Sequence, residues 1–399
     1  MFPSELWKEI LSRLPAKCLL RSRCVSKSWR RMIDCPDLIK LHLNKSAESF
    51  TNHSLILTET GFNLHLLDLD LLDGNNNARV SKTPFVANNI YGISNTCNGI
   101  VVLIAEMFGP LALWNPFLRK RMIFPDSPSK CVEFYQYPSL FYGLCYDSRI
   151  DDYKVVRNYE YRNIYTREVE CSKTEIYTFK SKVWKEVQPF PCSLPYSSQM
   201  WGRQVNGALH ILCNDKAFKF RPNTAFKSRI VGFSVERESY FEWMLPLNIP
   251  TKGVFMGLDL LGDCLMLACD SSLCVNVWVM KEYGVQESWT NLITIVYPMA
   301  HVLTDLFKPL VYSKDGKKVL FFCNQFNFVW YDLERKTMEK VEVGGVPFLI
   351  QLEDCVQSLV FPGGSSEPSE GKKNGQERKD KKVKQKRDDF LSKGFKLKL

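Results

Sequence analysis

The chain of 399 residues lacks most of the features that mark an enzyme, a secreted protein or a membrane protein. It has only five histidines. It has no uninterrupted apolar run of about 18 residues, the length needed to span a membrane. No charged N-terminal region followed by an apolar run predicts a secretory signal. The G-x-S-x-G turn, the glycine-rich phosphate loop and the H-E-x-x-H helix are also missing. We therefore expect neither a membrane span nor export.

Cysteine is plentiful, with fourteen residues spread along the chain, mostly inside apolar runs. Without an export signal we expect these thiols to stay reduced and to pack as small apolar groups. The most closely spaced set is Cys264, Cys269 and Cys274, and no histidine lies near it. Zinc sites usually combine cysteine pairs two to four residues apart with a second pair or histidines. The sequence therefore predicts no metal and no cofactor.

Candidate catalytic groups are few. The adjacent acids at Asp151–Asp152 and at Glu236 and Glu238 lie among turn-forming or charged residues, where solvated turns are expected. His210 lies in the apolar run ALHIL and is expected to pack in a core, and Cys213 is expected to be buried rather than nucleophilic. We expect no catalytic residue, and therefore a protein that is not itself an enzyme.

The net charge of +10 is concentrated at the two ends of the chain. Residues 1–45 hold ten Lys and Arg against four Asp and Glu, and residues 362–399 hold twelve against six, so each end carries +6. The middle, residues 46–361, is left with 31 against 33, or −2. A nearly neutral middle does not argue for a nucleic-acid-binding core.

Residues 1–45 have helical spacing. Leu6, Ile10 and Leu14 recur every four residues, behind Ser4, a residue type that can cap a helix. Pro36 can begin a later helix at its first position. Helices this short cannot bury all of their apolar groups among themselves. Either they cap the following domain, or they bury the surplus in another protein.

Three stretches of this segment, EILSRLP at residues 9–15, KCLLR at 17–21 and RCVSKSW at 23–29, resemble an F-box in order and spacing. The segment departs from the family at Ser22, where a large residue is common, and only two residues precede Pro3. The resemblance implies binding to the Skp adaptor of a cullin-based ubiquitin ligase. The residues that it places on the adaptor-facing set are Pro3, Leu6, Ile10, Leu11, Leu14, Pro15, Leu19, Leu20, Val25 and Trp29.

From about residue 54 the pattern changes to short runs of β-branched and aromatic residues between Gly, Asn, Asp and Pro, which predicts an all-β domain. A strand followed by a polar turn and a large apolar residue recurs six times at intervals of 47, 63, 56, 46 and 52 residues. A period near 50 is typical of kelch-type propeller blades, and about six are expected. A pair of β-sandwiches is the alternative. The repeat anchors are Leu67, Trp114, Tyr177, Phe233, Val279 and Tyr331.

Several motifs of this region, among them LWNP at residues 113–116 and VNGALH at 205–210, resemble the F-box-associated, kelch-like region of plant F-box proteins. True kelch blades carry a glycine pair that is scarce here. The resemblance implies that the propeller captures a protein target. We expect the binding surface on the long connections at residues 107–110, 127–138, 159–171 and 191–202. The aromatic candidates there either lie on the surface or pack against neighbouring blades, and they are Phe134, Tyr135, Tyr137, Tyr161, Tyr165, Tyr196 and Trp201.

Residues 362–399 begin with a linker-like PGGSSEPS and continue with a Lys- and Arg-rich run from Lys372 to Arg387. Such a composition predicts a disordered basic tail. It is expected to be dispensable for folding, and it could be a solvated tail, a nuclear import signal or a segment that touches nucleic acid. We expect the protein in the cytoplasm, the nucleus or both.

Together these patterns predict an α plus all-β multidomain protein: an F-box at 1–45, a β-propeller at 46–361 and a disordered tail at 362–399. The expected function is the substrate-recognition subunit of a Skp–cullin–F-box ubiquitin ligase that promotes degradation of a protein target. The expected partners are a Skp-family adaptor and, through it, a cullin, without membrane or nucleic acid. The alternative is a non-catalytic propeller scaffold or glycan-binding protein whose helices only cap the fold. A glycan-processing propeller enzyme lacks a convincing acid pair.

Overall fold

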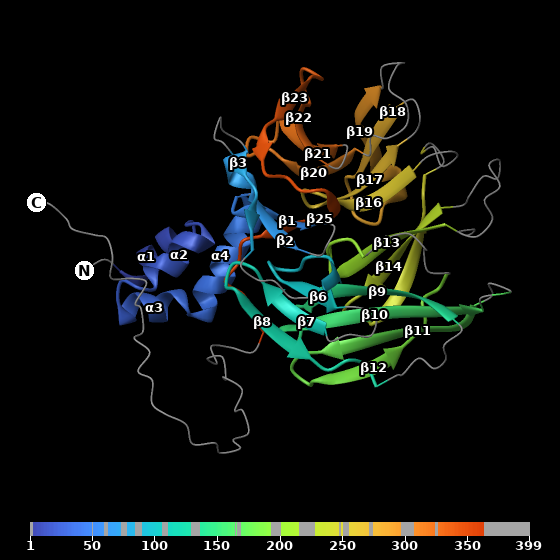
Figure 1. The fold of residues 1–399 in the computed structure, drawn as a ribbon, viewed down its shortest axis with the longest axis horizontal. Coiled ribbons are helices and arrows are strands. Elements are labelled where there is room, and N and C mark those ends of the chain that lie inside the picture. Colours follow the sequence, from blue (N-terminus) through green and yellow to red (C-terminus); the bar gives the residue numbers. More distant parts are fainter. Residues whose placement is uncertain are drawn as a thin grey trace, which may run out of the picture. The chain divides into compact units, whose positions relative to one another are not determined.

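The computed structural model comprises four N-terminal helices followed by a β-propeller (Figure 1). It describes residues 3–49, 51–59, 63–72, 78–83, 90–105, 111–128, 136–163, 165, 169–192, 201–214, 228–246, 249, 255–270, 274–296, 307–323 and 326–362. The predicted tail, apart from residue 362, lies outside the described residues.

The N-terminal segment forms α1 (Ser4–Leu11), α2 (Ala16–Ser22), α3 (Lys27–Ile33) and α4 (Pro36–Glu48). Pro36 occupies the first turn of α4 as predicted. The expected cap at Ser4 is wrong, because α1 begins at Ser4 itself and the hydroxyl donates to the Glu5 carboxylate. A serine does cap α3, where Ser26 Oγ accepts a bond of 3.1 Å from the amide of Trp29.

Six antiparallel sheets in the described part of the chain form the blades of the propeller. This confirms the predicted propeller and its blade count, and the β-sandwich alternative is wrong. Blade 1 contains β25 (Leu349–Val356), β1 (His53–Glu59), β2 (Leu64–Asp68) and β4 (Ser81–Lys82). Blade 2 contains β5 (Ile90–Ile93), β6 (Val101–Ala105), β7 (Leu111–Asn115) and β8 (Lys120–Phe124). Blade 3 contains β9 (Gln136–Asp147), β10 (Asp152–Asn163), β11 (Val169–Thr178) and β12 (Val183–Val187).

Blades 4 to 6 follow the same order from the axis outward. Blade 4 contains β13 (Ala208–Asn214), β14 (Ser228–Ser234) and β15 (Ser239–Met244). Blade 5 contains β16 (Phe255–Leu261), β17 (Cys264–Asp270), β18 (Cys274–Met280) and β19 (Trp289–Val296). Blade 6 contains β20 (Lys308–Tyr312), β21 (Lys318–Cys323), β22 (Asn327–Asp332) and β23 (Met338–Val341). A short parallel pair, β24 (Val343–Gly344) with β3 (Ala78–Arg79), joins the exit of blade 6 to blade 1.

The last strand closes the circle. β25 pairs antiparallel with β1, in a register that sets Cys355 opposite Ser54 and Glu353 opposite Ile56. Blade 1 is therefore built from both ends of the propeller sequence. Closure of this kind leaves few exposed sheet edges.

The repeat anchors predicted from the sequence occupy equivalent positions. Leu67 lies on β2, Trp114 on β7 and Tyr177 on β11, each the third strand from the axis. Blade 4 keeps this pattern because residues 201–205 take the innermost place, where the Gly202 amide donates to the His210 carbonyl at 2.9 Å. The predicted period therefore marks one strand of every blade.

Two Asn-Gly pairs form tight turns between the inner strand and the second strand. Asn98 and Gly99 have φ of 51° and 79°, and Asn206 and Gly207 have 47° and 72°. Positive φ at both positions suits a two-residue hairpin. At Gly99 a Cβ would lie 2.5 Å from the Val356 carbonyl oxygen, so a side chain does not fit. We call the end of the propeller that carries these inner hairpins the hairpin end.

The helices and the propeller share a core. Leu359, which follows β25, is 6% exposed and packs with Leu11, Leu19 and Ile33 of the helices. Asn52, with φ of 59°, donates from its side chain to Ser46 of α4 and from its backbone to Asp70 of blade 1. The chain up to residue 364 is one compact unit. The helices do cap the propeller, as one alternative predicted.

We expect Leu359→Ala to destabilise the helices by about 2–4 kcal/mol, because it leaves a cavity beside Leu19. Hydrogen exchange should show faster exchange in α1 to α4. Val360→Ala is the matched control, since Val360 packs against the core of blades 2 and 3 instead. Equal protection of the helices in both variants would contradict the shared core.

Candidate functional site

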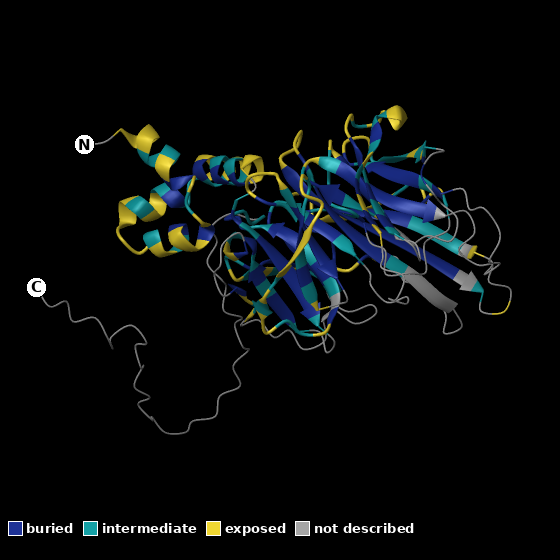
Figure 2. Ribbon diagram, turned by 90° about the horizontal axis from the view of Figure 1, so that it is seen from above, coloured by how far each residue is buried: buried dark blue, intermediate teal, exposed yellow. Residues whose placement is uncertain are grey.

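The first candidate site is an apolar face on the helices. Leu6, Ile10 and Val25 are 47%, 53% and 66% exposed, although all three are large and apolar. Figure 2 shows that the helices carry many exposed residues. Large apolar residues left exposed on a small domain are typical of a protein-binding surface. We call the exposed and half-exposed members of the predicted adaptor set the helical face: Pro3, Leu6, Ile10, Leu14, Pro15, Leu20, Val25 and Trp29.

Two members of that set lie beneath the face. Leu11 and Leu19 are 1% and 0% exposed and form the helical core with Ile33 and Leu38. They support the face from inside and offer no surface to a partner in this conformation. Equal spacing along the chain does not separate the exposed leucines from these two, since only the packing of the four helices with one another and with Leu359 buries them.

Polar contacts fix the junction between α1 and α2 at the centre of the helical face. His42 of α4 is buried, and its Nε2 donates to the Leu14 carbonyl at 2.9 Å. Burial lowers the pKa of His42, which favours the neutral ring. Lys45 of α4 forms an ion pair with Glu9, and the rings of Trp7 and Trp29 lie 5.2 Å apart. The face is therefore held in place before any partner binds.

The second candidate site is the other end of the propeller. Strands alternate in direction, so β6, β8, β10 and β12 all run away from the hairpin end. Three of the long connections assigned to the target surface, 107–110, 127–138 and 191–202, follow β6, β8 and β12, although residues 136–138 already belong to β9. The prediction of a long connection at 159–171 is wrong, because β10 continues to Asn163 and β11 begins at Val169. Antiparallel pairing therefore brings all of these boundaries to one end, which we call the far end. Loops at one end of a rigid scaffold are common binding sites.

The aromatic residues predicted for this surface differ in their exposure to solvent. Tyr165 is 84% exposed at the far end of β10, in agreement with the prediction. Trp201 and Tyr161 are 2% and 6% exposed, so these two follow the packing alternative and do not lie on the surface. Trp201 donates to Asn158 at 3.0 Å and packs in the core between blades 3 and 4. Phe134, Tyr135 and Tyr196 lie outside the described residues, as does the side chain of Tyr137.

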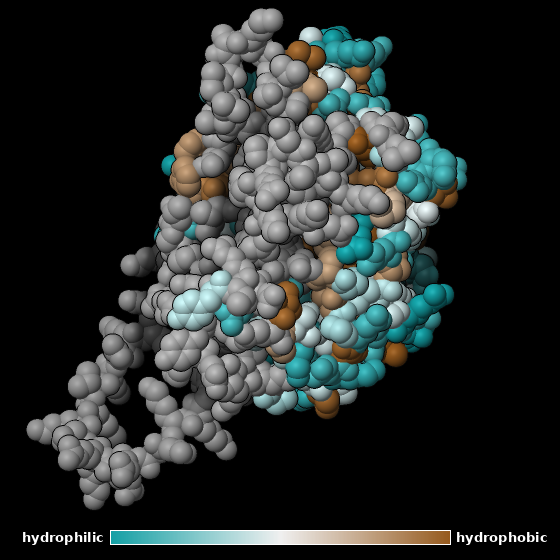
Figure 3. Space-filling view, turned by 90° about the vertical axis from the view of Figure 1, so that its right-hand side faces the viewer, coloured by the Kyte–Doolittle hydropathy of each residue, from teal (hydrophilic) through white to brown (hydrophobic). Residues whose placement is uncertain are grey.

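The sequence missed an aromatic pair at the far end. Phe326, between β21 and β22, and Phe348, just before β25, are 47% and 45% exposed, with ring centroids 5.4 Å apart. Val169, Met244 and Val296 are also exposed where strands reach this end. On the right-hand side of Figure 1, seen in Figure 3, apolar side chains show among hydrophilic ones. The sequence around Phe326 gave no sign of exposure, since it looks like part of a strand.

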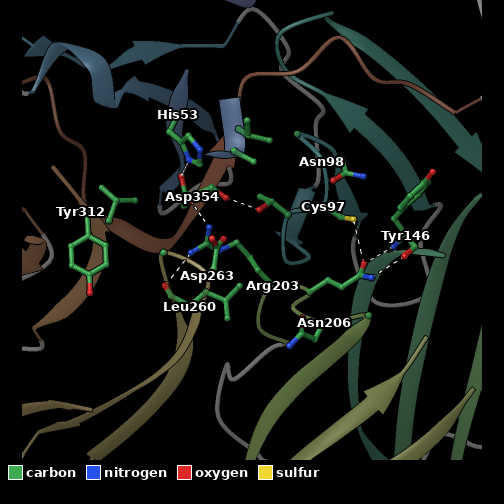
Figure 4. Close-up of a pocket in the computed structure, with 18 residues that line it drawn as sticks. His53, Cys97, Asn98, Tyr146, Arg203, Asn206, Leu260, Asp263, Tyr312 and Asp354 are labelled. Atoms are coloured by element: carbon green, nitrogen blue, oxygen red, sulfur yellow. Dashed lines mark hydrogen bonds and ion pairs between the residues drawn. The ribbon is translucent and has the colours of Figure 1, made fainter. Parts of the chain in front are cut away.

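A cavity of about 340 Å³ lies on the axis at the hairpin end (Figure 4). Arg203 projects into it, forms an ion pair with Asp354 of β25 and donates to the Leu260 carbonyl at 3.0 Å. His53 Nδ1 lies 3.0 Å from the same Asp354 carboxylate. Ala47 of α4 also lines the cavity, so this helix reaches it.

Side chains on the axis join each blade to the next. The side-chain amide of Gln351 accepts from the backbone N–H of Ile93 and donates to its carbonyl. The side-chain amide of Asn95 makes the same pair of bonds with Leu144, and that of Gln204 makes them with Tyr146. These amides imitate a neighbouring strand where the inner strands diverge. Two cationic side chains link the remaining blades. Arg203 of blade 4 donates to the Leu260 carbonyl of blade 5. Lys308 of blade 6 forms an ion pair with Asp259 of blade 5 at 3.5 Å and donates to the Leu352 carbonyl of blade 1 at 3.1 Å. The network explains the polar axis as a structural feature.

The pKa values of two acids on the axis, Asp354 and Glu353, are shifted in opposite directions by burial and nearby charge. For Asp354, burial raises the pKa, but His53 and Arg203 outweigh burial and lower it below its usual value. For Glu353, burial raises the pKa to about 7, with Lys308 opposing the shift. Glu353 therefore binds a proton more tightly in the folded chain than in the unfolded chain.

This difference predicts a pH effect. Because the folded pKa of Glu353 lies above its unfolded value of 4.5, its contribution to stability is complete below about pH 4.5 and is lost as pH rises through about 7. The quantity to compare is the free energy of unfolding of the wild type minus that of Glu353→Gln. We expect this difference to fall by about 1–3 kcal/mol as the pH rises from 4.5 to 8. Urea unfolding of both proteins across this range measures it. A constant difference would show that the pKa of Glu353 is the same in the folded and the unfolded chain.

The acid pairs considered for catalysis have structural roles. Asp152 is buried, against the expectation of a solvated turn, and accepts bonds from the Tyr153 and Lys180 amides. Glu238 pairs with Lys154 at 2.9 Å, and Lys154 pairs with Asp147 at 2.8 Å. His210 is buried as predicted and contacts the Tyr283 hydroxyl at 2.9 Å.

The described residues contain no group of three or more side chains suited to hold a metal ion. Cys264, Cys269 and Cys274 therefore do not form such a group either. Searched over the same part of the chain, no helix has both the length and the apolar character to cross a membrane.

Comparison with known proteins gives two family matches. The family described as F-box domain matches residues 1–41, and the family described as F-box associated beta propeller domain matches residues 55–360. "F-box protein CPR1" of Arabidopsis thaliana is 31% identical over 412 residues, covering 99% of this chain and 98% of that protein. "Protein SUPPRESSOR OF NIM1 1" from the same plant is 27% identical over 347 residues, covering 81% and 86%.

Proposed function

Since the chain belongs to the F-box proteins that carry an F-box-associated β-propeller, we propose that it is the substrate-recognition subunit of a Skp–cullin–F-box ubiquitin ligase. In this proposal the helical face binds a Skp-family adaptor. The far end of the propeller binds a protein target, which is then ubiquitinated and degraded.

The observation that carries the proposal is the helical face itself. Its large apolar residues remain exposed although the helices already share a core with the propeller through Leu359. Capping the propeller therefore does not account for Leu6, Ile10 and Val25, and a protein partner would. The alternative of a scaffold with a helical cap explains the docking of the helices and leaves this surface unexplained.

The proposed role is to supply proximity rather than chemistry. The acids and the histidine considered for catalysis are occupied by structural contacts. A rigid connection between helices and propeller would hold a bound target at a fixed distance from the adaptor and its ligase. This raises the effective concentration of the target near the ubiquitin carrier.

The test is binding of the full chain to a purified Skp-family adaptor, measured by calorimetry and followed by addition of cullin. We expect a stable adaptor complex that recruits cullin. The intact chain must be used, because residues 1–50 alone would lack Leu359 and Leu118 from the helical core. A folded chain with a normal thermal transition that binds no adaptor would refute the proposal.

A further inference from the structure

The stretch between Glu9 and Asp34 contains no acidic residue. Residues 10–33 hold seven lysines and arginines and no aspartate or glutamate, so the net charge of this stretch is +7. It comprises the end of α1, the whole of α2 and α3 and the turns that join them. Neither α2 nor α3 has an acid in its first turn, where the helix dipole favours one. A concentrated positive charge therefore accompanies the helical face.

Ion pairs neutralise only part of this charge. Arg13 pairs with Glu9 at 2.6 Å, and Arg23 pairs with Asp34 at 2.9 Å. Arg30 shares the same Asp34 carboxylate at 3.6 Å. Four exposed cations of this stretch form no ion pair with any residue that the structure describes: Lys17, Arg21, Lys27 and Arg31.

Three of these cations adjoin apolar residues of the helical face. Arg21 directly follows Leu20 on α2, and Lys27 and Arg31 lie one turn apart on α3. Val25, which is 66% exposed, lies in the turn between the two helices. We call Arg21, Lys27 and Arg31 the basic rim.

The stability of the helices does not account for the whole basic rim. The helix dipole favours Arg21 and Arg31, which lie in the last turns of α2 and α3. Lys27 begins α3, at the end where the dipole disfavours a cation. It also lies four residues before Arg31, and like charges at this spacing repel each other and weaken a helix. An acidic surface outside the chain would compensate for both effects.

We propose that the basic rim binds an acidic margin of the adaptor surface that covers the helical face, and that its charge accelerates the encounter of the two proteins. This inference rests on the proposed function, because it takes the adaptor as the occupant of the helical face. Charges at the rim of an interface act mainly on the association rate, since their field reaches beyond contact distance. The rim sets how fast the complex forms, and the apolar residues set how long it lasts.

The surroundings of the basic rim favour a protein over a nucleic acid or an anionic membrane. Exposed apolar side chains lie among the cations, and a phosphate backbone offers them nothing to pack against. Helices that lie on a membrane bury one continuous apolar face. Here Val25 lies in a turn between two helices of seven residues each, so the apolar residues do not form a single helix face. A folded partner with apolar and acidic groups side by side fits this surface.

The test measures the association rate of the full chain with a purified Skp-family adaptor by stopped-flow fluorescence, at salt concentrations from about 0.02 to 0.5 M. We expect the association rate of the wild type to fall about tenfold or more over this range, while the dissociation rate changes less than about threefold. The triple variant Arg21→Glu, Lys27→Glu, Arg31→Glu should associate about 10- to 100-fold more slowly than the wild type at the lowest salt. Its rate should no longer fall as salt is added.

The matched control is the triple variant Lys182→Glu, Lys281→Glu, Lys340→Glu. These exposed lysines belong to blades 3, 5 and 6, and the change in net charge is the same. The control should associate within about threefold of the wild-type rate. A second rim variant with glutamine at the same three positions guards against helices that the glutamates destabilise, and it should have an intermediate rate.

The outcomes separate this inference from the proposed function. Adaptor binding with the same rate and salt dependence in the rim and control variants would overturn the inference and leave the proposed function standing. A folded wild type that binds no adaptor would refute the proposed function, and the inference with it. The same proteins are also tested with a short DNA duplex and with phosphatidylserine vesicles. If the rim variants lose binding to either of these while their association with the adaptor is unchanged, the rim serves that other partner and the inference is wrong.

Discussion

Replacing Leu14 and Pro15 together by alanine is expected to weaken binding of the Skp-family adaptor by about 2–4 kcal/mol, roughly a 30- to 1,000-fold loss of affinity. Both residues lie at the junction of α1 and α2, with Pro15 exposed and Leu14 half-buried. His42 bonds the backbone carbonyl of Leu14, so alanine keeps that contact. The thermal transition of the propeller should not change.

Two control variants separate contact from folding. Ile123→Ala removes an apolar side chain that is 62% exposed on β8, away from the helical face, and should leave affinity unchanged. Leu19→Ala removes a side chain that is 0% exposed and should lower both stability and affinity. If the double variant behaves like Leu19→Ala, then Leu14 and Pro15 serve folding, and the helices act mainly as a cap.

Arg203→Met is expected to destabilise the propeller by about 3–5 kcal/mol, because it removes the cation while Asp354 keeps its charge in a buried position. The side chains of Arg203 and Asp354 are 18% and 6% exposed, so little solvent replaces the lost contact. The change also removes the link between blade 4 and the Leu260 carbonyl of blade 5. Urea unfolding measures the loss.

A double-mutant cycle with Asp354→Asn isolates the pair. Because the cost of Arg203→Met comes largely from the unpaired carboxylate, the double variant should be at least about 1 kcal/mol more stable than the sum of the single effects predicts. Lys82→Met, on the exposed outer strand of blade 1, is the control for loss of a cation. Additive effects would show that the two residues stabilise the axis independently.

The sequence determined the type and order of the elements. Proline and helical spacing placed the short N-terminal helices, and the recurrence of Leu67, Trp114 and Tyr177 marked the third strand of successive blades. These features are local, because each depends on a few neighbouring residues whose backbone preferences and periodicity act within one element. The same holds for the Asn-Gly turns, whose positive φ values follow from the residue types.

Only the tertiary structure decided which side chains are exposed and which distant residues meet. Leu11 and Leu14 are close neighbours that look alike in sequence, yet packing against α4 buries the first and leaves the second partly open. Trp201 resembled a surface aromatic residue, but the core between blades 3 and 4 encloses it.

The contacts that decide the rest join residues far apart in the chain. Leu359 enters the helical core, and Asp354 meets Arg203 and His53. None of these partners is within reach of a local pattern, because closure of the propeller by β25 is what brings the end of the domain back to its beginning. The sequence determined the blades, and ring closure, which depends on the summed geometry of all six, determined the sites between them.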